Sequence, residues 1–68
     1  MMYRDNEYAP EVGDRIEVYD EQDQFEPECA KVVKIGKNKL LVAWENEYIK
    51  PRQEWVKPDL CDLIAREG

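Results

Sequence analysis

The alternation of apolar and polar residues predicts a β-strand near the start of the chain. In residues 12–20 (VGDRIEVYD), Ile16 and Val18 fall on one face, and Arg15 and Glu17 fall on the other. A period of two is that of a half-buried strand, because successive side chains of a strand point to opposite faces. The acidic stretch that follows, EQDQFEPE, is broken by a proline and predicts a loop.

Three more runs, rich in β-branched, leucine or aromatic residues, predict further strands. They are residues 29–35 (CAKVVKI), 40–44 (LLVAW) and 53–56 (QEWV). The turn residues GKNK separate the first two runs, and the loop ENEYIKPR separates the last two. Residues 57–64 (KPDLCDLI) place a proline where a short helix begins, and residues 62–64 suit a last short strand.

Five short strands joined by turns and short loops predict an all-β fold, a small antiparallel barrel that is closed or nearly closed. A short helical turn precedes the last strand. A chain of 68 residues supports one domain with one small core. We expect residues 1–10 to form a flexible N-terminal arm ending at Pro10, and residues 11–65 to form the domain.

The charge of the chain is strongly asymmetric. The net charge is −6, but residues 1–28 carry ten acidic and two basic residues, whereas residues 29–68 carry six acidic and eight basic residues. An acidic chain repels the phosphate backbone of nucleic acids, and a basic peptide is its electrostatic complement. One alternative is weak contact with nucleic acid through the lysines near the GKNK turn, namely Lys31, Lys34, Lys37 and Lys39.

The residue types disfavour catalysis and metal binding. The chain has no serine, and because it has no histidine, Cys29 or Cys61 as a nucleophile would lack a histidine partner. Two isolated cysteines do not make a zinc site, and we expect reduced thiols in an intracellular protein. No run approaches the ~20 apolar residues of a membrane helix. We therefore expect a soluble, monomeric, non-enzymatic domain without a metal or cofactor.

The aromatic residues are the candidate binding groups. Trp55 lies in a short strand, and we expect it in the core. Trp44 ends the third predicted strand, where both a core position and a half-exposed position at the rim are open. Tyr48 lies between charged residues of a loop and is expected to be exposed. Phe25 is either a lid over the barrel or a binding-site ring.

The loops that carry these rings both connect an odd strand to an even strand, so they leave the same end of an antiparallel barrel. Phe25, Trp44 and Tyr48 are therefore predicted to form a partial aromatic cage. Asp23, Glu45 and Glu47 are the candidate charged rim. Aromatic faces attract an organic cation by about 0.5–2 kcal/mol per good contact, and carboxylates at the rim add to this attraction.

Residues 12–64 resemble the Royal family of SH3-like barrels, which includes Tudor, chromo-barrel, MBT and Agenet domains. The motifs are VGDRIEVYD, then ECAKV, then LVAW followed by EWV. The resemblance implies a five-stranded SH3-like barrel that reads methylated lysine or arginine on histone tails, in chromatin and hence in the nucleus. It matches Trp44 and Tyr48 to cage aromatics, Phe25 to a first-loop aromatic and Trp55 to a structural tryptophan.

One residue departs from the family pattern. Arg52 stands where chromo barrels often place another aromatic residue, and a cation there repels methylammonium. The alternative is a non-catalytic protein–protein interaction module without methyl recognition. It would use an edge strand or the surface between Arg52 and Lys57.

Overall fold

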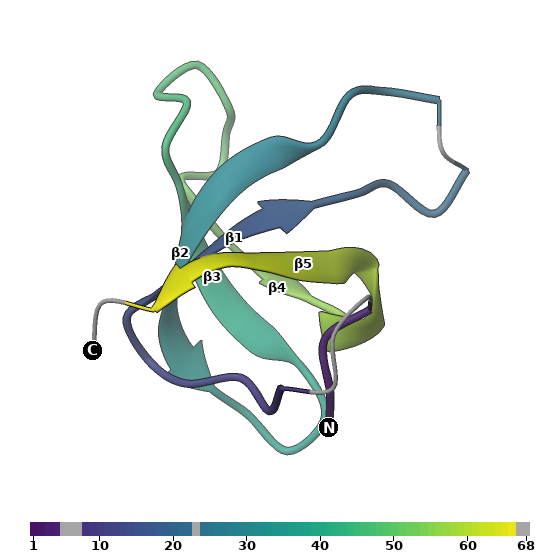
Figure 1. The fold of residues 1–68 in the computed structure, drawn as a ribbon. Helices are drawn as coiled ribbons and strands as arrows, with labels where there is room; N and C mark the ends of the chain where they lie inside the picture. The colour runs from purple at the N-terminus through teal and green to yellow at the C-terminus, as the bar shows by residue number, and fades with distance from the viewer. Residues whose placement is uncertain (5–7, 23, 67–68) are drawn as a thin grey trace.

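The structure, a computed structural model, describes residues 1–4, 8–22 and 24–66. Five strands form one antiparallel sheet in the order β4-β3-β2-β1-β5 (Figure 1). A 3-10 turn, η1 (Pro58–Leu60), joins β4 to β5. The strands are β1 (Asp14–Val18), β2 (Glu28–Ile35), β3 (Leu40–Trp44), β4 (Gln53–Val56) and β5 (Cys61–Arg66).

The predicted all-β class is confirmed, and β3 and β4 have the bounds that the sequence predicts. The short helical turn expected before the last strand is confirmed and spans Pro58–Leu60. Pro58 suits the first turn of a helix because it has no N–H to place. From Cys61 the chain is extended and pairs with β1, so the last strand is longer than expected.

The sheet is open, and the closed form of the predicted barrel is not shown. Within the described ranges, β4 and β5 are its two edges and do not pair with each other. Register shifts interrupt the pairing next to Arg15 in β1 and between Val32 and Lys34 in β2. Such irregularities bend a strand and increase its twist. In Figure 1, β5 accordingly crosses the view while β2 and β3 run down it.

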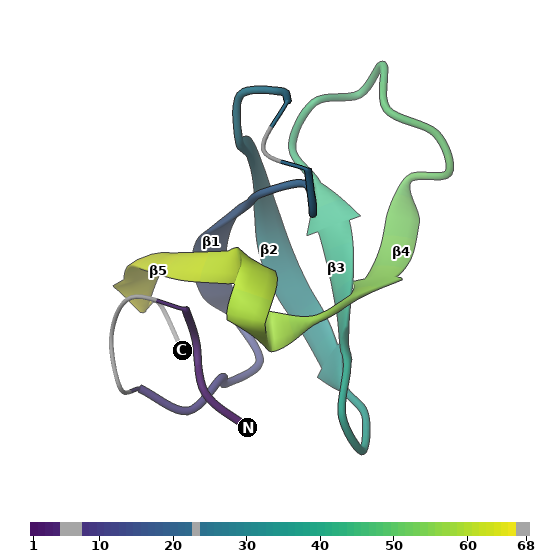
Figure 2. The same cartoon turned by 90° about the vertical axis from the view of Figure 1, so that its right-hand side faces the viewer.

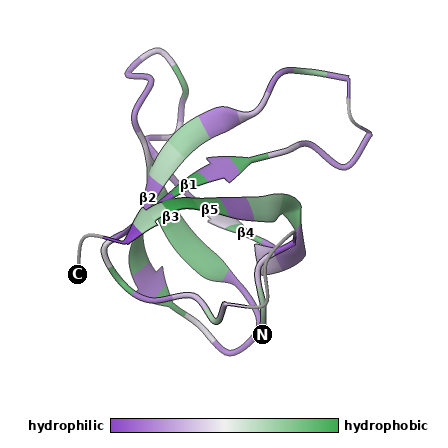
Figure 3. Cartoon of the chain, viewed as in Figure 1, coloured by the Kyte–Doolittle hydropathy of each residue, from purple (hydrophilic) through white to green (hydrophobic). Residues whose placement is uncertain are grey.

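One face of the sheet forms the core. Alternate residues of β1 and β3 are buried, as a half-buried strand requires, and the apolar residues concentrate in the strands while the loops are hydrophilic (Figure 3). Ile49, Val56 and Leu63 pack against this core from its margin. The buried apolar residues are Tyr3, Ile16, Val18, Ala30, Val32, Leu40, Val42, Trp44 and Cys61.

The N-terminal segment contributes to this core, which the sequence did not indicate. Tyr3 is buried, and the backbone N–H of Arg4 donates to the carbonyl oxygen of Cys61 at 2.9 Å. The domain boundary expected at residue 11 therefore leaves out a core residue. The expectation of a flexible arm also covers residues 5–7, which lie outside the described residues.

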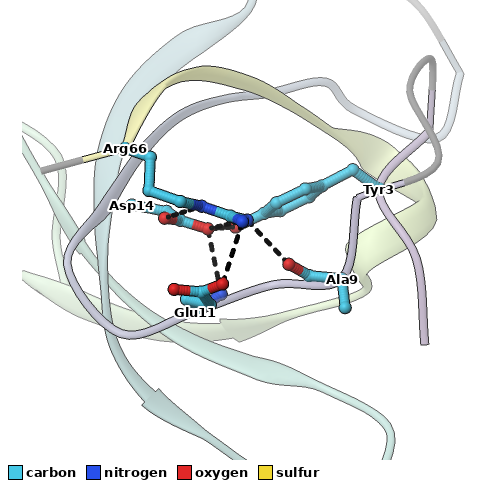
Figure 4. Close-up of polar contacts among 5 residues, drawn as sticks. All are labelled: Tyr3, Ala9, Glu11, Asp14 and Arg66. Carbon is cyan, nitrogen blue, oxygen red and sulfur yellow. Dashed lines mark hydrogen bonds and ion pairs between the residues drawn. The ribbon is translucent and has the colours of Figure 1, made fainter. Parts of the chain in front are cut away.

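A buried carboxylate connects the two ends of the chain. Asp14 has no exposed surface, and its Oδ2 accepts hydrogen bonds from the Tyr3 hydroxyl at 2.7 Å and the Glu11 backbone at 2.9 Å (Figure 4). Arg66 of β5 donates to Asp14 at 3.0 and 3.1 Å and to the carbonyl of Ala9 at 2.7 Å. The carboxylate is thus paired and hydrogen-bonded, which is the condition for burying a charge without a large penalty.

In the part of the chain that the structure describes, no helix combines the length and the apolar character needed to span a bilayer. Both cysteines are free thiols. Burial, together with Asp59 and Asp62, raises the pKa of the Cys61 thiol to about 12. This thiol therefore stays protonated at neutral pH and behaves as a small apolar core residue.

Candidate functional site

The loops that carry the candidate rings leave the same end of the sheet, as the strand order requires. They are the β1–β2 loop (residues 19–27) and the β3–β4 loop (residues 45–52), and Figure 2 shows both rising above the strands. In Figure 1 the tips of the two loops are well separated. The backbone therefore places both candidate loops at one end of the sheet without joining their tips.

Phe25 lies exposed on a loop whose backbone is held by one carboxylate. Its side chain is 73% exposed, so the alternative of a lid over the core is wrong. Asp20 accepts the backbone N–H of Gln24 at 3.1 Å and that of Phe25 at 3.2 Å. The hydrogen bond from Gln24, and then that from Phe25, holds the pKa of Asp20 below its usual value against the opposing effect of desolvation. Asp20 is therefore ionised at neutral pH and fixes the backbone beneath the ring.

Tyr48 is held in a similar way. Its side chain is 87% exposed, as expected, and its backbone N–H donates to Oδ1 of Asn46 at 3.0 Å. The next residue, Ile49, donates its backbone N–H to the Asn46 carbonyl at 3.1 Å and packs its side chain against the core. The loop is thus anchored on the core side and presents the tyrosine to solvent.

Trp44 belongs to the core, which decides between the two positions left open by the sequence. It is 9% exposed, and its indole N–H donates to Oε1 of Glu54 at 3.2 Å. A hollow of about 450 Å³ beneath Tyr48 is lined by Glu47, Lys50 and Arg52, and neither Phe25 nor Trp44 lines it. The structure therefore does not bring the three predicted cage residues together around this hollow.

The three candidate rim residues have different environments. Asp23 lies outside the described residues. Glu45 forms a two-pronged ion pair with Arg15, with distances of 2.7 and 3.0 Å. This contact holds the pKa of Glu45 below its usual value. Glu47 is exposed and lines the same hollow as Tyr48. Among the described rim candidates, it is therefore the one that lies beside a candidate ring without an ion pair to Arg15.

The expectation that Trp55 lies in the core is wrong. Trp55 pairs with Leu41 on the face opposite the core and is 48% exposed, whereas its neighbour Val56 pairs with the buried Leu40. Its ring covers Gly36 of the β2–β3 hairpin, where a Cβ atom would lie 2.9 Å from Cζ3 of Trp55. The alternation of β4 puts Val56 on the core side and therefore turns Trp55 outward.

Sequence reasoning also missed the residues that position the rings. The sequence pattern singles out neither Asp20 nor Asn46. The signal that could have found Asp20 and Asn46 is their residue type and their position at the start of a loop. Asp and Asn side chains in turns commonly accept a hydrogen bond from a backbone N–H a few residues later. Their role is to order the loops and does not require contact with a ligand.

Among the described residues, no group of three or more His, Cys, Asp or Glu side chains is placed to hold a metal ion. No family model, curated protein or solved structure matches this chain.

Proposed function

We propose that this chain is a non-catalytic interaction module that binds a basic peptide through the β1–β2 and β3–β4 loops, with methylated lysine or arginine as the preferred cation. One observation carries the proposal. Phe25 and Tyr48 are the two most exposed large apolar side chains among the described residues, and the loops that carry them lie at the same end of the sheet. Binding residues lie disproportionately on loops that a rigid scaffold positions, and both rings lie on such loops.

The local hydrogen bonds support a preformed site. Asp20 and Asn46 each hold the backbone of the loop at the ring, so less conformational entropy is lost when a ligand binds. An exposed aromatic face attracts a cation, and a methylated ammonium loses less hydration than a bare lysine when it contacts the ring. The first effect favours any cation, and the second favours methylated over unmodified side chains.

The burial of Trp44 changes the cage that the sequence suggests. Phe25 and Tyr48 would form two separate walls with Glu47 at the rim, and Trp44 would support the loop from the core. Lys50 and Arg52 line the hollow beneath Tyr48, so a ligand cation would approach from the side of Phe25, away from these charges. A site with two rings is expected to bind more weakly than a complete cage.

We also propose that the chain belongs to the SH3-like barrels of the Royal family, and the fold supports this assignment. The supporting features are an antiparallel sheet of five strands, a bulged β2, and a short 3-10 turn that leads into a last strand paired with β1. If the assignment is correct, a methylated histone tail is the natural ligand, and the protein would act on chromatin in the nucleus. A lysine-rich tail also complements the acidic net charge of −6.

Peptide titrations followed by amide NMR test the proposal. Lysine-containing histone-tail peptides in the unmodified, mono-, di- and trimethylated forms should shift the amides of residues 20–26 and 46–49, with the largest shifts for the methylated forms. Phe25→Ala and Tyr48→Ala should each weaken binding. Tyr8→Ala, which removes an exposed ring from the N-terminal segment, is the matched control and should not.

Two outcomes would overturn parts of the proposal. Shifts of equal size with unmodified and trimethylated peptides would favour an interaction module without methyl recognition, which the burial of Trp44 makes the second candidate. The absence of any shift in the two loops at millimolar peptide would reject the loop end as the binding surface.

A further inference from the structure

The molecule has a second hollow at the end opposite the loops. The β2–β3 hairpin, residues 36–39, points away from the β1–β2 and β3–β4 loops in Figure 2, and the N-terminus lies near it. A hollow of about 570 Å³ lies there. Its lining includes Met1, Met2, Lys37, Lys39, Lys57 and Asp59.

This hollow combines apolar walls with positive charge. Met1 and Met2 are both about half exposed, and three of the lining residues are lysines against one acid. Lys57 contacts Glu21 at 3.3 Å, and Lys39 and Lys57 line a smaller hollow together with Asp20 and Glu21 at the start of the β1–β2 loop. Within the described ranges, however, no ion pair involves Lys37 or Lys39. The hollow therefore suits a segment that carries an apolar ring beside negative charge.

The opposite end of the same chain carries such a segment. Gln24, Phe25 and Glu26 are all exposed, and the backbone N–H groups of Gln24 and Phe25 donate to Asp20, which fixes the loop backbone there. The surrounding sequence, EQDQFEPE, contains no basic residue. The two ends of one molecule are thus complementary in charge and in apolar character.

We propose that copies of this chain associate head to tail, with Phe25 of one copy entering the hollow between Met2, Lys37 and Lys39 of the next. The inference goes beyond the proposed function and rests on it only in treating the loop end as a binding surface. Phe25 would contact the methionine thioethers, which interact favourably with aromatic rings, and Glu26 would lie near the lysines.

The geometry determines the kind of assembly. A contact between two different surfaces closes into a ring only if the rotation between copies allows it, and otherwise produces an open chain of copies. The contact is one loop in one hollow, so it lies at the small end of specific interfaces, which bury roughly 1,200 Å² or more. We therefore expect weak, concentration-dependent association and a monomer at low concentration.

Salt affects the two charge effects differently. Copies that each carry a net charge of −6 repel one another, but this long-range repulsion is screened over about 8 Å at physiological ionic strength. The contacts between Glu26 and the lysines are short and are screened less. Association should therefore be measured at about 0.15 M salt, where attraction at the contact outweighs the residual repulsion.

Two variants, each blocked at one end, provide the test. Phe25→Ala keeps the hollow and loses the ring, and Lys37→Glu/Lys39→Glu keeps the ring and reverses the hollow. Sedimentation velocity at concentrations up to about 1 mM should show a range of oligomers for the wild type and a monomer for each variant alone. An equimolar mixture of the variants should give a 1:1 dimer that does not grow, because each copy retains one working end.

The control variant is Lys31→Glu/Lys34→Glu. It changes the net charge by the same amount, but neither lysine lines the hollow, so this variant should associate like the wild type. Circular dichroism checks that every variant is folded. A wild type that remains monomeric overturns the inference, as does association of either blocked variant alone or the absence of a dimer in the mixture.

Failure of this inference can be distinguished from failure of the proposed function. Lys37→Glu/Lys39→Glu keeps the Phe25 and Tyr48 loops, so its binding to methylated peptide tests the proposed function without self-association. A monomeric wild type with normal peptide binding removes only the self-association. Association in the mixture without peptide binding removes only the recognition of methylated side chains.

Discussion

The hydroxyl of Tyr3 donates a 2.7 Å hydrogen bond to Oδ2 of Asp14, a carboxylate with no exposed surface. Arg66 donates to the same carboxylate, so residues 52 positions apart in the chain meet at one buried charge. This contact connects the N-terminal segment to the first and last strands. It explains why Tyr3 belongs to the core although it precedes the expected domain boundary.

Removing the Tyr3 hydroxyl should destabilise the fold. A hydrogen bond to a charged group contributes about 1.5–3 kcal/mol, so Tyr3→Phe should lower the free energy of unfolding by about that amount. Chemical denaturation measures it. Tyr8→Phe is the control, because it keeps the ring whose centroid lies 5.5 Å from the Arg66 guanidinium, and it should leave stability nearly unchanged. Equal effects of the two substitutions would contradict a specific role for the Tyr3–Asp14 hydrogen bond.

Asp14 should make stability depend on acid pH. Burial alone would raise its pKa, but hydrogen bonds from Arg66, Tyr3 and the Glu11 backbone outweigh burial and hold it below the ordinary 3.8. A carboxyl group with a lower pKa in the folded state contributes stability above its unfolded-state pKa and loses that stability as pH falls through the folded-state pKa.

Thermal unfolding from pH 7 down to about pH 2 checks this dependence. Wild-type stability should show no contribution from Asp14 to its pH slope near neutrality and should fall as pH drops below 3.8. Asp14→Asn should be less stable at neutral pH and should have a shallower acid slope. Parallel pH profiles for the two proteins would show that Asp14 is not responsible.

The candidate rings should differ in their effect on stability. Phe25→Ala and Tyr48→Ala remove exposed side chains and should change the free energy of unfolding by no more than about 0.5 kcal/mol. Trp44→Ala leaves a cavity in the core and should cost about 3–5 kcal/mol. Denaturation of the three variants checks this. A large loss of stability in Phe25→Ala would mean that its ring is packed, which would weaken the case for a binding site.

Gly36 and Trp55 should be energetically coupled. Gly36→Ala would place a methyl group 2.9 Å from Cζ3 of Trp55 and 3.1 Å from the Lys39 carbonyl oxygen, and overpacking of this kind costs about 1–3 kcal/mol. In a Trp55→Ala background the first clash is absent, so the same substitution should cost at least about 0.5 kcal/mol less. Denaturation of the four proteins of this double-mutant cycle gives the coupling, and simple additivity would contradict the contact.

The sequence predicted the strands well where the pattern is local. Leu40–Trp44 is a continuous apolar run between turn residues, and its bounds follow from that contrast alone. The last strand was predicted only in part. The sequence indicates the turn at Pro58 and a strand over residues 62–64, whereas the full strand runs from Cys61 to Arg66. Its length depends on pairing with β1, a long-range contact that no local pattern reports.

The candidate site was predictable in its topology but not in its details. The shared end of the two loops follows from antiparallel strand order, whereas the position of each ring depends on side-chain direction. Trp44 lies on the face of β3 that points into the core, and it is buried. In β4, Val56 points toward the core, so its neighbour Trp55 points to the opposite face and is exposed. Residue type suggested a core position for Trp55, and the alternation of the strand decided against it.

The most direct test of the central claim compares two ligands of the same shape. A trimethyl-lysine peptide and its neutral analogue, in which carbon replaces the quaternary nitrogen, fill the same volume and differ only in charge. If Phe25 and Tyr48 recognise a cation through their faces, calorimetry should show about 2- to 30-fold tighter binding of the charged peptide, corresponding to about 0.5–2 kcal/mol. Equal affinity for the two peptides, or no binding of either, would contradict the account.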